Sequence, residues 1–197
     1  CRPVDIRFLI GDDGSTDRSV ERIKAVQQRL NRADFQVSIS EFGINRGPNA
    51  VINDLVRQTL SDSDYTVALD ADDRLRPEYF TTMLYAMHKA ELVDSHGKAF
   101  NKGISRPFDA TAYQEKSYIP STSLIKSSVL RESVQAQPFD ETVRKHTKHT
   151  RYKQLIRDGS KGLYIPAALF DYRQHGANLC EIGNATLLNR GVNHRIT

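Results

Sequence analysis

Cysteine, long apolar runs and targeting signals are scarce in this chain of 197 residues. Its two cysteines, Cys1 and Cys180, give no disulfide framework or metal cluster, so we expect a reducing compartment. No run of about 18 apolar residues occurs, and a membrane span is therefore not expected. The opening residues, CRPVDIRF, lack an initiator methionine and the architecture of a signal peptide. We expect a cytoplasmic domain whose sequence starts inside a longer protein.

The composition is ordinary for a globular protein, with 39% hydrophobic and 26% charged residues. This length suits one domain with a proper core. The net charge of +4 is compatible with anionic ligands or an anionic membrane surface. The basic residues are scattered apart from one denser cluster, Arg144 to Lys153, which favours a solvated surface. A nucleic-acid-binding domain is the alternative from a different class, but no recognisable module or basic stripe with interleaved aromatics supports it.

The first half of the chain alternates between apolar runs and segments with helical periodicity. Ser15 or Asp17 can cap the first helix, and Pro48 and Pro77 suit the first position of the next two. Such alternation implies parallel strands joined by right-handed crossovers, with ligands beyond the carboxyl ends of the strands. We expect strands at residues 4–10, 35–42 and 65–69, and helices at residues 15–30, 47–60 and 77–92.

The second half is less regular. Residues 94–114 are polar and predict a loop, and residues 121–133 predict a short helix. A longer helix is expected over 140–159, ended by Gly159, and a strand over 162–176 that is broken at Pro166. We therefore expect a single domain over 1–197, with a nucleotide-type half of about 4–95, a second half of about 96–180 that completes a cleft, and a tail over 181–197.

Two acidic clusters fall at predicted strand ends. In the segment ALDADD, Asp70 and Asp72 are two residues apart, so in an extended chain they face the same side. Two carboxylates suit a hard divalent cation, Mg²⁺ or Mn²⁺, which commonly takes further oxygens such as those of a diphosphate. The alternative is that both are solvated or cap the following helix.

The other cluster, in GDDGSTD, places Asp13 at a strand tip. There the carboxylate could accept an N–H from the edge of a nucleobase, and Gly14 allows a sharp turn. Helix capping and turn chemistry explain the same residues without a ligand.

Three segments in this order, IGDDGSTDRSVERIK, FGINRGPNAVIND and ALDADDRLRPEYF, resemble the family 2 glycosyltransferases of the GT-A fold. Later segments, STSLIKSSVL, PFDET and GLYIPAALFDYRQHGAN, resemble the acceptor-side half of that family, as in bacterial capsule-polysaccharide and chondroitin-type synthases. The resemblance covers about Val4 to Asn178. It implies an α/β, Rossmann-like, mostly parallel sheet flanked by helices, with an acceptor-side lobe.

The resemblance also implies an activity. The family transfers a sugar, of the hexosyl or N-acetylhexosaminyl class, from a nucleotide diphosphate sugar, usually a UDP-sugar, with inversion at the anomeric carbon. The implied cofactor is Mn²⁺ or Mg²⁺, and the implied acceptor is a saccharide or a lipid-linked hydroxyl compound. Polysaccharide biosynthesis for the cell envelope, peripheral association with the inner face of the membrane and no nucleic-acid partner follow from the same resemblance.

The family motifs assign roles to positions of this chain. By resemblance, Asp13 recognises the base, and the NRG segment contributes to the nucleotide pocket. Asp70 contacts the nucleotide sugar and, with Asp72, forms the metal-binding triplet, while the YRQHG segment lies near the diphosphate. His175 could be a further metal ligand or simply a surface histidine after a strand. The residues predicted to bind the nucleotide sugar are Asp13, Arg46, Asn53, Asp70 and Arg173, and those predicted to bind metal are Asp70, Asp72 and His175.

Two features depart from the family pattern. The family's first strand and its Pro-x-Tyr-Asn-like turn are absent from this chain, which begins at the second strand. The family's acidic pair, which supplies the general base, is replaced by Thr147 and Lys148, and a protonated lysine cannot accept a proton.

His149 is our choice of catalytic base, because an imidazole can be neutral at pH 7. His146 and Glu141 are the alternatives. The histidines could also be surface residues on a basic helix, in which case the chain would bind nucleotide sugars without transferring the sugar.

Overall fold

Two units make up the chain in the computed structural model, which describes residues 4–59, 62–87, 92–97, 108–115, 119–143 and 147–173. The first unit consists of Cys1–Thr59, Phe139–Arg144 and Ile182–Thr197, and the second of Leu60–Pro138 and Lys145–Glu181. The short segment at 139–144 therefore returns to the first unit, far along the chain from the rest of it. The division into halves of about 4–95 and 96–180 stays a prediction, and the expected tail at 181–197 lies outside the described residues.

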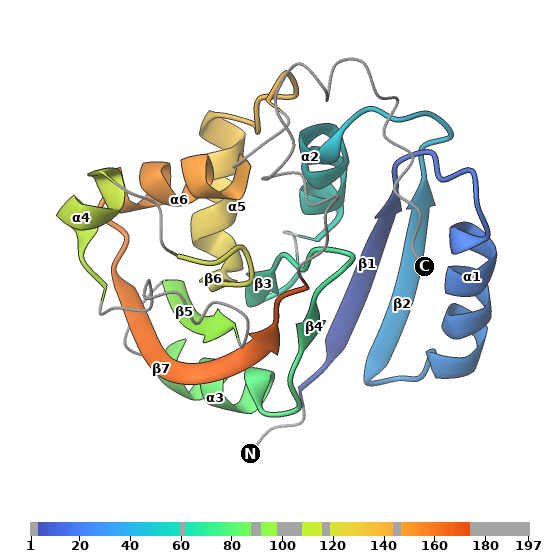
Figure 1. Cartoon of the computed structure of the whole chain (residues 1–197), viewed down its shortest axis with the longest axis horizontal. Coiled ribbons are helices and arrows are strands. Elements are labelled where there is room, and N and C mark those ends of the chain that lie inside the picture. The colour runs from blue at the N-terminus through green and yellow to red at the C-terminus, as the bar shows by residue number, and fades with distance from the viewer. Residues whose placement is uncertain are drawn as a thin grey trace. The chain divides into compact units, whose positions relative to one another are not determined.

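The first unit is built on two parallel strands. β1 (Ile6–Asp12) pairs with β2 (Phe35–Glu41) in a register that runs from Ile6 opposite Phe35 to Asp12 opposite Glu41. Helix α1 (Ser19–Leu30) packs on β2, and helix α2 (Pro48–Thr59) packs on β1 (Figure 1). The predicted strand–helix alternation with parallel pairing is confirmed here, and α2 begins at the predicted proline.

Gly11 explains how closely α2 approaches β1. A Cβ atom at this position would lie 2.2 Å from Cγ1 of Val51 on α2, which is far inside van der Waals contact. The glycine in the apolar run before the two aspartates is therefore a packing residue that lets the helix lie directly on the strand.

Helix α1 starts four residues later than predicted. The backbone N–H of Ser15 donates to Oδ2 of Asp12 at 3.1 Å, and the N–H of Ser19 donates to Oδ1 of Asp17 at 2.9 Å. These two side chains satisfy backbone groups of a turn between strand and helix, so Asp17 rather than Ser15 supports the first helical turn.

The second unit contains a five-stranded sheet in the order β3 (Tyr65–Val67), β6 (Leu124–Lys126), β5 (Leu92–Gly97), β7 (Gly162–Asp171), β4 (Arg74–Leu75). Among the described residues of this sheet, β5 and β7 pair in parallel and the three other pairings are antiparallel. The sheet expected to be mostly parallel is therefore mixed in this unit. Each antiparallel pairing includes at least one strand, β4, β5 or β6, that the sequence did not identify.

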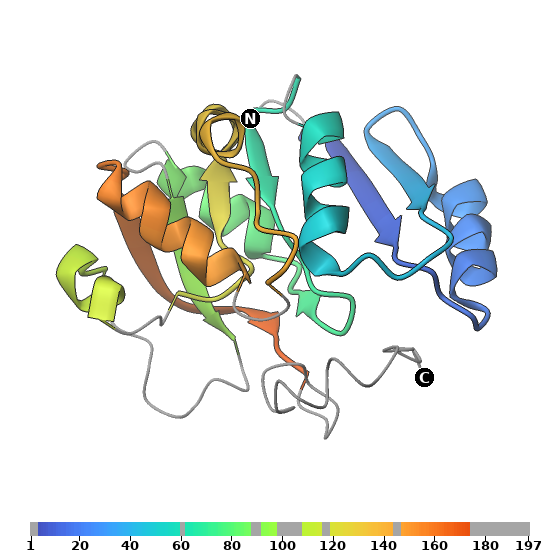
Figure 2. The same cartoon turned by 90° about the horizontal axis from the view of Figure 1, so that it is seen from above.

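Helix α3 (Tyr79–Ala86) covers part of this sheet and supplies much of its core. Tyr79 and Met83 are fully buried with Leu124 and Leu169 from the sheet, and the Tyr79 hydroxyl donates to the carbonyl of Thr122 at 2.6 Å. Three further helices, α4 (Ala110–Glu115), α5 (Ser127–Ala136) and α6 (Thr147–Arg157), pack around one another, with α6 in contact with both α4 and α5 (Figure 2).

Several predicted boundaries in the second half were wrong. The residues LIK within the predicted helix 121–133 form strand β6, and the helix begins only at Ser127. Strand β5 lies in the stretch predicted as a loop from residue 94. Helix α6 covers only the later part of 140–159, and Gly159, at φ 91°, follows its end as predicted. β7 continues through Pro166, where its register with β5 shifts instead of breaking.

Candidate functional site

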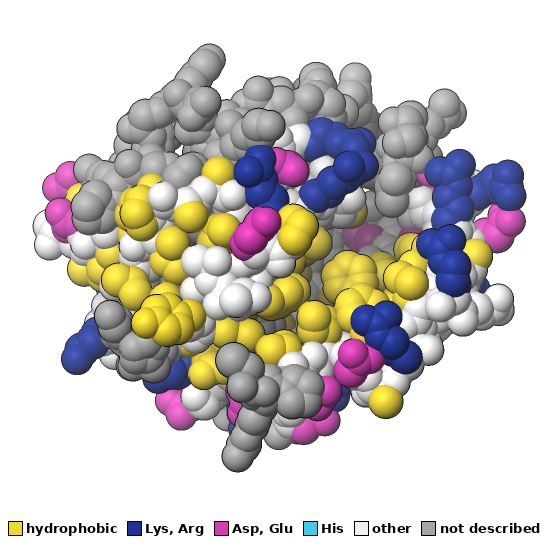
Figure 3. Space-filling view, turned by 90° about the horizontal axis from the view of Figure 1, so that it is seen from below, with side chains coloured by type: hydrophobic (Ala, Val, Ile, Leu, Met, Phe, Trp, Pro, Cys, Tyr) yellow, Lys and Arg dark blue, Asp and Glu magenta, His cyan; other side chains and the backbone are white. Residues whose placement is uncertain are grey.

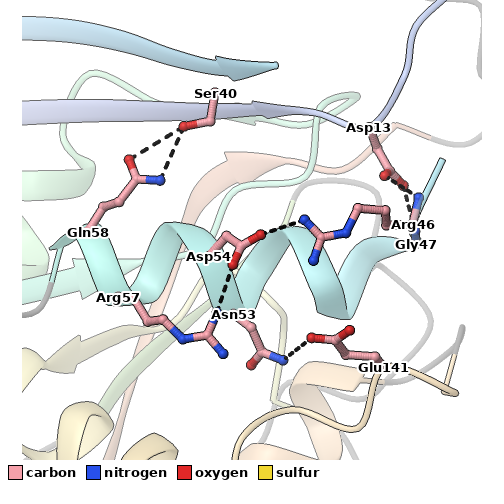
Figure 4. Close-up of polar contacts among 9 residues, drawn as sticks. All are labelled: Asp13, Ser40, Arg46, Gly47, Asn53, Asp54, Arg57, Gln58 and Glu141. Atoms are coloured by element: carbon pink, nitrogen blue, oxygen red, sulfur yellow. Dashed lines mark hydrogen bonds and ion pairs between the residues drawn. The ribbon is translucent and has the colours of Figure 1, made fainter. Parts of the chain in front are cut away.

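Asp13 anchors the loop that leads into α2. Its Oδ1 accepts the backbone N–H of Arg46 at 2.6 Å, and its Oδ2 accepts the N–H of Gly47 at 2.8 Å (Figure 4). A carboxylate has about four lone-pair positions, so each oxygen keeps capacity for one more donor. Asp13 thus has a structural partner 33 residues along the chain, and its contact with a nucleobase stays a prediction.

Gly14 brings the turn after β1 directly onto the same loop. A Cβ atom there would lie 2.8 Å from the carbonyl carbon of Ile44 and 2.9 Å from the nitrogen of Asn45, both of which are backbone atoms. The residue also has a φ of 79°, which favours glycine. The Asp-Asp-Gly turn and the Asn-Arg-Gly loop therefore form one packed assembly.

The side chain of Arg46 lies along α2. Its Nη1 donates to Oδ2 of Asp54 at 2.7 Å (Figure 4). Its guanidinium carbon also lies over the Phe42 ring, 5.2 Å from the ring centroid. Oδ1 of the same Asp54 accepts from Nη1 of Arg57 at 2.7 Å. Arg46 is only half-buried, and these contacts hold its planar donor group in a fixed position at the start of the helix.

Asn53 is buried and ties α2 to the segment at 139–141. Its amide nitrogen donates to the carbonyl of Phe139 at 2.9 Å. The same nitrogen donates to Oε1 of Glu141 at 3.0 Å (Figure 4). Its Oδ1 accepts the Phe139 N–H at 2.9 Å, and Asn49 donates to the carbonyl of Asp140 at 2.5 Å. Both amide hydrogens of Asn53 are used within the protein, so a direct nucleotide contact by this residue stays a prediction.

The second acidic cluster forms a tight turn after β3, in which the N–H of Asp73 donates to the carbonyl of Asp70 at 3.1 Å. Oδ1 of Asp70 pairs with Nζ of Lys148 at 2.5 Å, and Oδ2 accepts the Ser121 hydroxyl at 2.9 Å. Desolvation alone would raise the pKa of Asp70, but the Lys148 charge and hydrogen bond, the Ser121 hydroxyl and the charge of His149 together lower it. Asp70 is therefore an ionised partner of Lys148.

Asp73 is the buried member of this turn, with 7% of its surface exposed. Its Oδ1 accepts the backbone N–H of Arg173 at 3.0 Å, while its Oδ2 is buried without a hydrogen-bond partner. Burial raises the pKa of Asp73 to about 6; the Arg173 N–H opposes this shift, and the nearby charges of Asp70 and Asp72 add to it. Sequence reasoning passed over Asp73, although a third acid in one short turn is itself a signal of mutual repulsion.

The chain after β7 is fixed beside the acidic turn. Besides the contact from Asp73, Nη2 and Nε of Arg76 donate to Oδ1 of Asp171 at 2.8 and 3.1 Å. The backbone of Arg173 is thereby held in place while its side chain is exposed. His175 and His146 lie outside the described residues.

His149 is half-buried on α6. Its Nδ1 lies 3.2 Å from the hydroxyl of Tyr113, and its ring meets the Tyr152 ring edge-on with centroids 6.4 Å apart. Lys148 and His149 are consecutive, and both act electrostatically on Asp70. The structure therefore brings the candidate base to the acidic turn, and the alternative, Glu141, is bound to Asn53 in the first unit.

Within the described ranges, no group of three or more His, Cys, Asp or Glu side chains is arranged to hold a metal ion. Asp72 is half-buried at the turn. Both oxygens of Asp70 have protein partners. A divalent cation bound to Asp70 would therefore have to displace Lys148.

The basic surplus is dispersed. On the face drawn in Figure 3, Lys and Arg side chains stand in separate small groups, several of them beside Asp or Glu. Among the helices that the structure describes, none is long and apolar enough to cross a membrane.

Comparison with known proteins identifies what these motifs have in common. A family model described as "Glycosyl transferase family 2" matches residues 3–146. An uncharacterized glycosyltransferase of Haemophilus influenzae is 31% identical over 93 residues, which cover 47% of this chain and 35% of that protein. The chain thus spans about a third of the length of this curated relative.

Two solved structures share the fold at low identity. TarS of S. aureus, in complex with UDP, matches with a TM-score of 0.65 and 13% identity, over 85% of this chain and 51% of that one. The mannosyltransferase PcManGT of Pyrobaculum calidifontis, with GDP-Man and Mn²⁺, matches with a TM-score of 0.66 and 13% identity, over 83% of this chain and 46% of that one. The α/β, GT-A-like fold is confirmed; a chondroitin-type similarity is not shown.

Proposed function

We propose that this chain, which belongs to glycosyl transferase family 2, transfers a sugar from a nucleoside diphosphate sugar to a hydroxyl group of an acceptor. The observation that supports this most directly is the acidic turn after β3, where three carboxylates, Lys148, His149 and the backbone of Arg173 converge. A site with charges of both signs suits a diphosphate and the proton that the acceptor must lose. Family membership also argues against the nucleic-acid-binding alternative.

A UDP-sugar is the proposed donor. Two neighbours in fold were solved with UDP or with GDP-Man, which supports a nucleoside diphosphate sugar in general. In this chain, Asp13 would read the base with the lone pairs that its contacts to residues 46 and 47 leave available. The exposed side chain of Arg173 would donate charge-assisted hydrogen bonds to the diphosphate.

A divalent cation, Mn²⁺ or Mg²⁺, would be held at Asp72, with His175 as a further proposed ligand. When bound, such an ion acts as a Lewis acid on the leaving diphosphate. Asp70 would act at the same turn as a nucleotide-sugar contact, oriented by the hydroxyl of Ser121.

Transfer with inversion needs a base for the acceptor hydroxyl, and we assign this role to His149. If Nδ1–H donates to the oxygen of Tyr113, the neutral ring presents Nε2 as its proton acceptor. A saccharide or lipid-linked acceptor, and a place in cell-envelope polysaccharide synthesis, belong to the same proposal.

A product assay tests the function. The chain is incubated with a panel of nucleotide sugars and saccharide acceptors, and released UDP or GDP and glycosylated product are measured by mass spectrometry. Asp72→Ala serves as the low-activity comparison. Calorimetry with UDP and GDP accompanies the assay, and a chain that binds neither nucleotide and forms no product would refute the proposal.

A further inference from the structure

We propose that Lys148 is a built-in cation of the acidic turn, which makes nucleoside diphosphate binding largely independent of a divalent metal ion. The inference rests on the proposed function for its ligand. Its starting point is the contact between Nζ of Lys148 and Oδ1 of Asp70 at 2.5 Å, formed by residues 78 positions apart.

The burial of this ion pair distinguishes it from an ordinary surface pair. The Lys148 side chain is 14% exposed, whereas that of Asp70 is 47% exposed. In the pair of Lys24 and Glu41, at 2.6 Å, both side chains are about half-exposed, at 50% and 43%. A charge with so little access to water interacts more strongly with neighbouring charges than a surface charge does.

The position of Lys148 on its helix goes against local electrostatics. It is the second residue of α6, and the first turn of this helix contains no acidic residue. Helix N-termini favour negative side chains, so a buried ammonium there needs compensation from outside the helix. Asp70 provides that compensation, which indicates that Lys148 is placed for the turn and not for the stability of α6.

Two side chains from the middle of α6 hold this helix in place. The hydroxyl of Tyr152 donates to the carbonyl of Ser121 at 2.8 Å. The hydroxyl of the same serine donates to Oδ2 of Asp70, so α6 and the acidic turn share this residue. Nη1 of the buried Arg151 donates to the carbonyl and hydroxyl of Ser133 at 2.9 and 2.7 Å, and Nη2 donates to the carbonyl of Gln137. These contacts fix the helix that carries the ammonium.

The consequence for ligands follows from charge. An ammonium has three donors, and Asp70 takes one of them, so Nζ can also donate to diphosphate oxygens. By neutralising Asp70, it reduces the attraction of the turn for a divalent cation and the repulsion of the turn for a diphosphate. The fixed charge of Lys148 thus neutralises Asp70 and attracts the diphosphate, as a metal ion shared with Asp70 would.

The test compares Lys148→Met with Lys148→Arg, which keeps the charge, and with Lys24→Met, which breaks the exposed ion pair. Mn²⁺ binding without nucleotide, and UDP binding in EDTA or Mn²⁺, are measured by calorimetry. For the parent we expect UDP dissociation constants in EDTA and Mn²⁺ to agree within about threefold. Lys148→Met should bind UDP about tenfold or more weakly than the parent in EDTA and regain its UDP affinity in Mn²⁺. It should also bind Mn²⁺ alone about tenfold more tightly than the parent. Lys148→Arg and Lys24→Met should resemble the parent.

Two results would overturn the inference. One is an unchanged Mn²⁺ affinity in Lys148→Met. The other is a parent that binds UDP about tenfold or more weakly in EDTA than in Mn²⁺. If no variant binds UDP or GDP, the proposed function fails, but the Mn²⁺ titration still decides the role of Lys148. Circular dichroism checks folding. If Lys148→Met does not fold, Lys148→Gln, which can still donate to Asp70 without a charge, gives the same readouts.

Discussion

Asn53 should contribute strongly to the stability of the first unit, because its side chain satisfies the backbone of a segment that has no regular structure. The amide is 2% exposed and bonds to both the N–H and the carbonyl of Phe139, as well as to Glu141. In Asn53→Ala both backbone groups lose their partner. An unsatisfied buried group costs about 1–3 kcal/mol, so we expect a loss of about 2–4 kcal/mol in the free energy of unfolding. That is a large part of the 5–15 kcal/mol or so by which domains are usually stable.

Gln58 provides a matched control on the same helix. It is also an amide that bonds to a distant residue, Ser40, at 3.2 Å, but it is exposed (Figure 4). Gln58→Ala should therefore cost less than about 0.5 kcal/mol. Urea unfolding of the parent and both variants gives the midpoint and the slope m, and a lower midpoint at constant m identifies a change in stability.

Equal midpoints for the two variants would refute the reasoning. A second readout separates the two roles of Asn53. If the amide only holds residues 139–141, folded Asn53→Ala keeps its UDP affinity within about twofold of the parent. A loss of about tenfold would instead support the sequence-based assignment of Asn53 to the nucleotide pocket.

The other predictions concern the acidic residues and the base. Asp13→Asn replaces one of the two carboxylate oxygens with an amide donor that faces a backbone N–H. Because the loss of a charged hydrogen bond costs about 1.5–3 kcal/mol, UDP affinity measured by calorimetry should fall about ten- to a hundredfold. Asp72→Ala should remove the part of UDP binding that depends on Mn²⁺, most visibly in the Lys148→Met background, and an unchanged metal response would exclude Asp72 as a ligand. Burial raises the pKa of Asp73 in the folded state to about 6, above its ordinary value of 3.8, so the folded state holds this proton more tightly. Stability should therefore fall as the pH rises from about 4 to about 6. Asp73→Asn should flatten that part of the profile in urea unfolding, and identical slopes would contradict the assignment. His149→Ala should lower turnover about a hundred- to ten-thousandfold with UDP binding nearly intact, and the parent rate should fall on acidification through about pH 6–7, where an imidazole ordinarily gains its proton.

Local patterns in the sequence predicted the first unit well. The apolar strands, the helical spacing and the proline at the start of α2 all act within a few residues, and the observed β1–α1–β2–α2 order follows them. Strands β5 and β6 were missed for the opposite reason. LVDSHG has little strand pattern of its own, and LIK sits inside a stretch with helical character, so both depend on partners far away in the chain.

In the candidate site, too, the sequence predicted the features set by neighbouring residues and missed those set by distant partners. The sequence identified the two acidic strand ends, because carboxylates after apolar runs are visible as a pattern. It did not identify what those carboxylates contact, because the partners of Asp13 and Asp70 lie 33 and 78 residues further along the chain. Lys148 was read only as a residue unsuited to be a base, and its pairing with Asp70 depends on where α6 starts.

One kind of contact recurs wherever a loop carries a predicted ligand-binding residue. A short polar side chain from elsewhere in the chain bonds to the backbone of the loop and so positions that backbone. The residues that hold such loops are Asp13, Asn53 and Asp73, and the residues whose backbone or neighbouring backbone they hold are Arg46, Glu141 and Arg173. For Arg46 and Arg173, which are predicted nucleotide-sugar contacts, replacing the holding residue Asp13 or Asp73 should therefore impair ligand binding about as much as replacing the arginine itself, because binding depends on both the donor group and its fixed position.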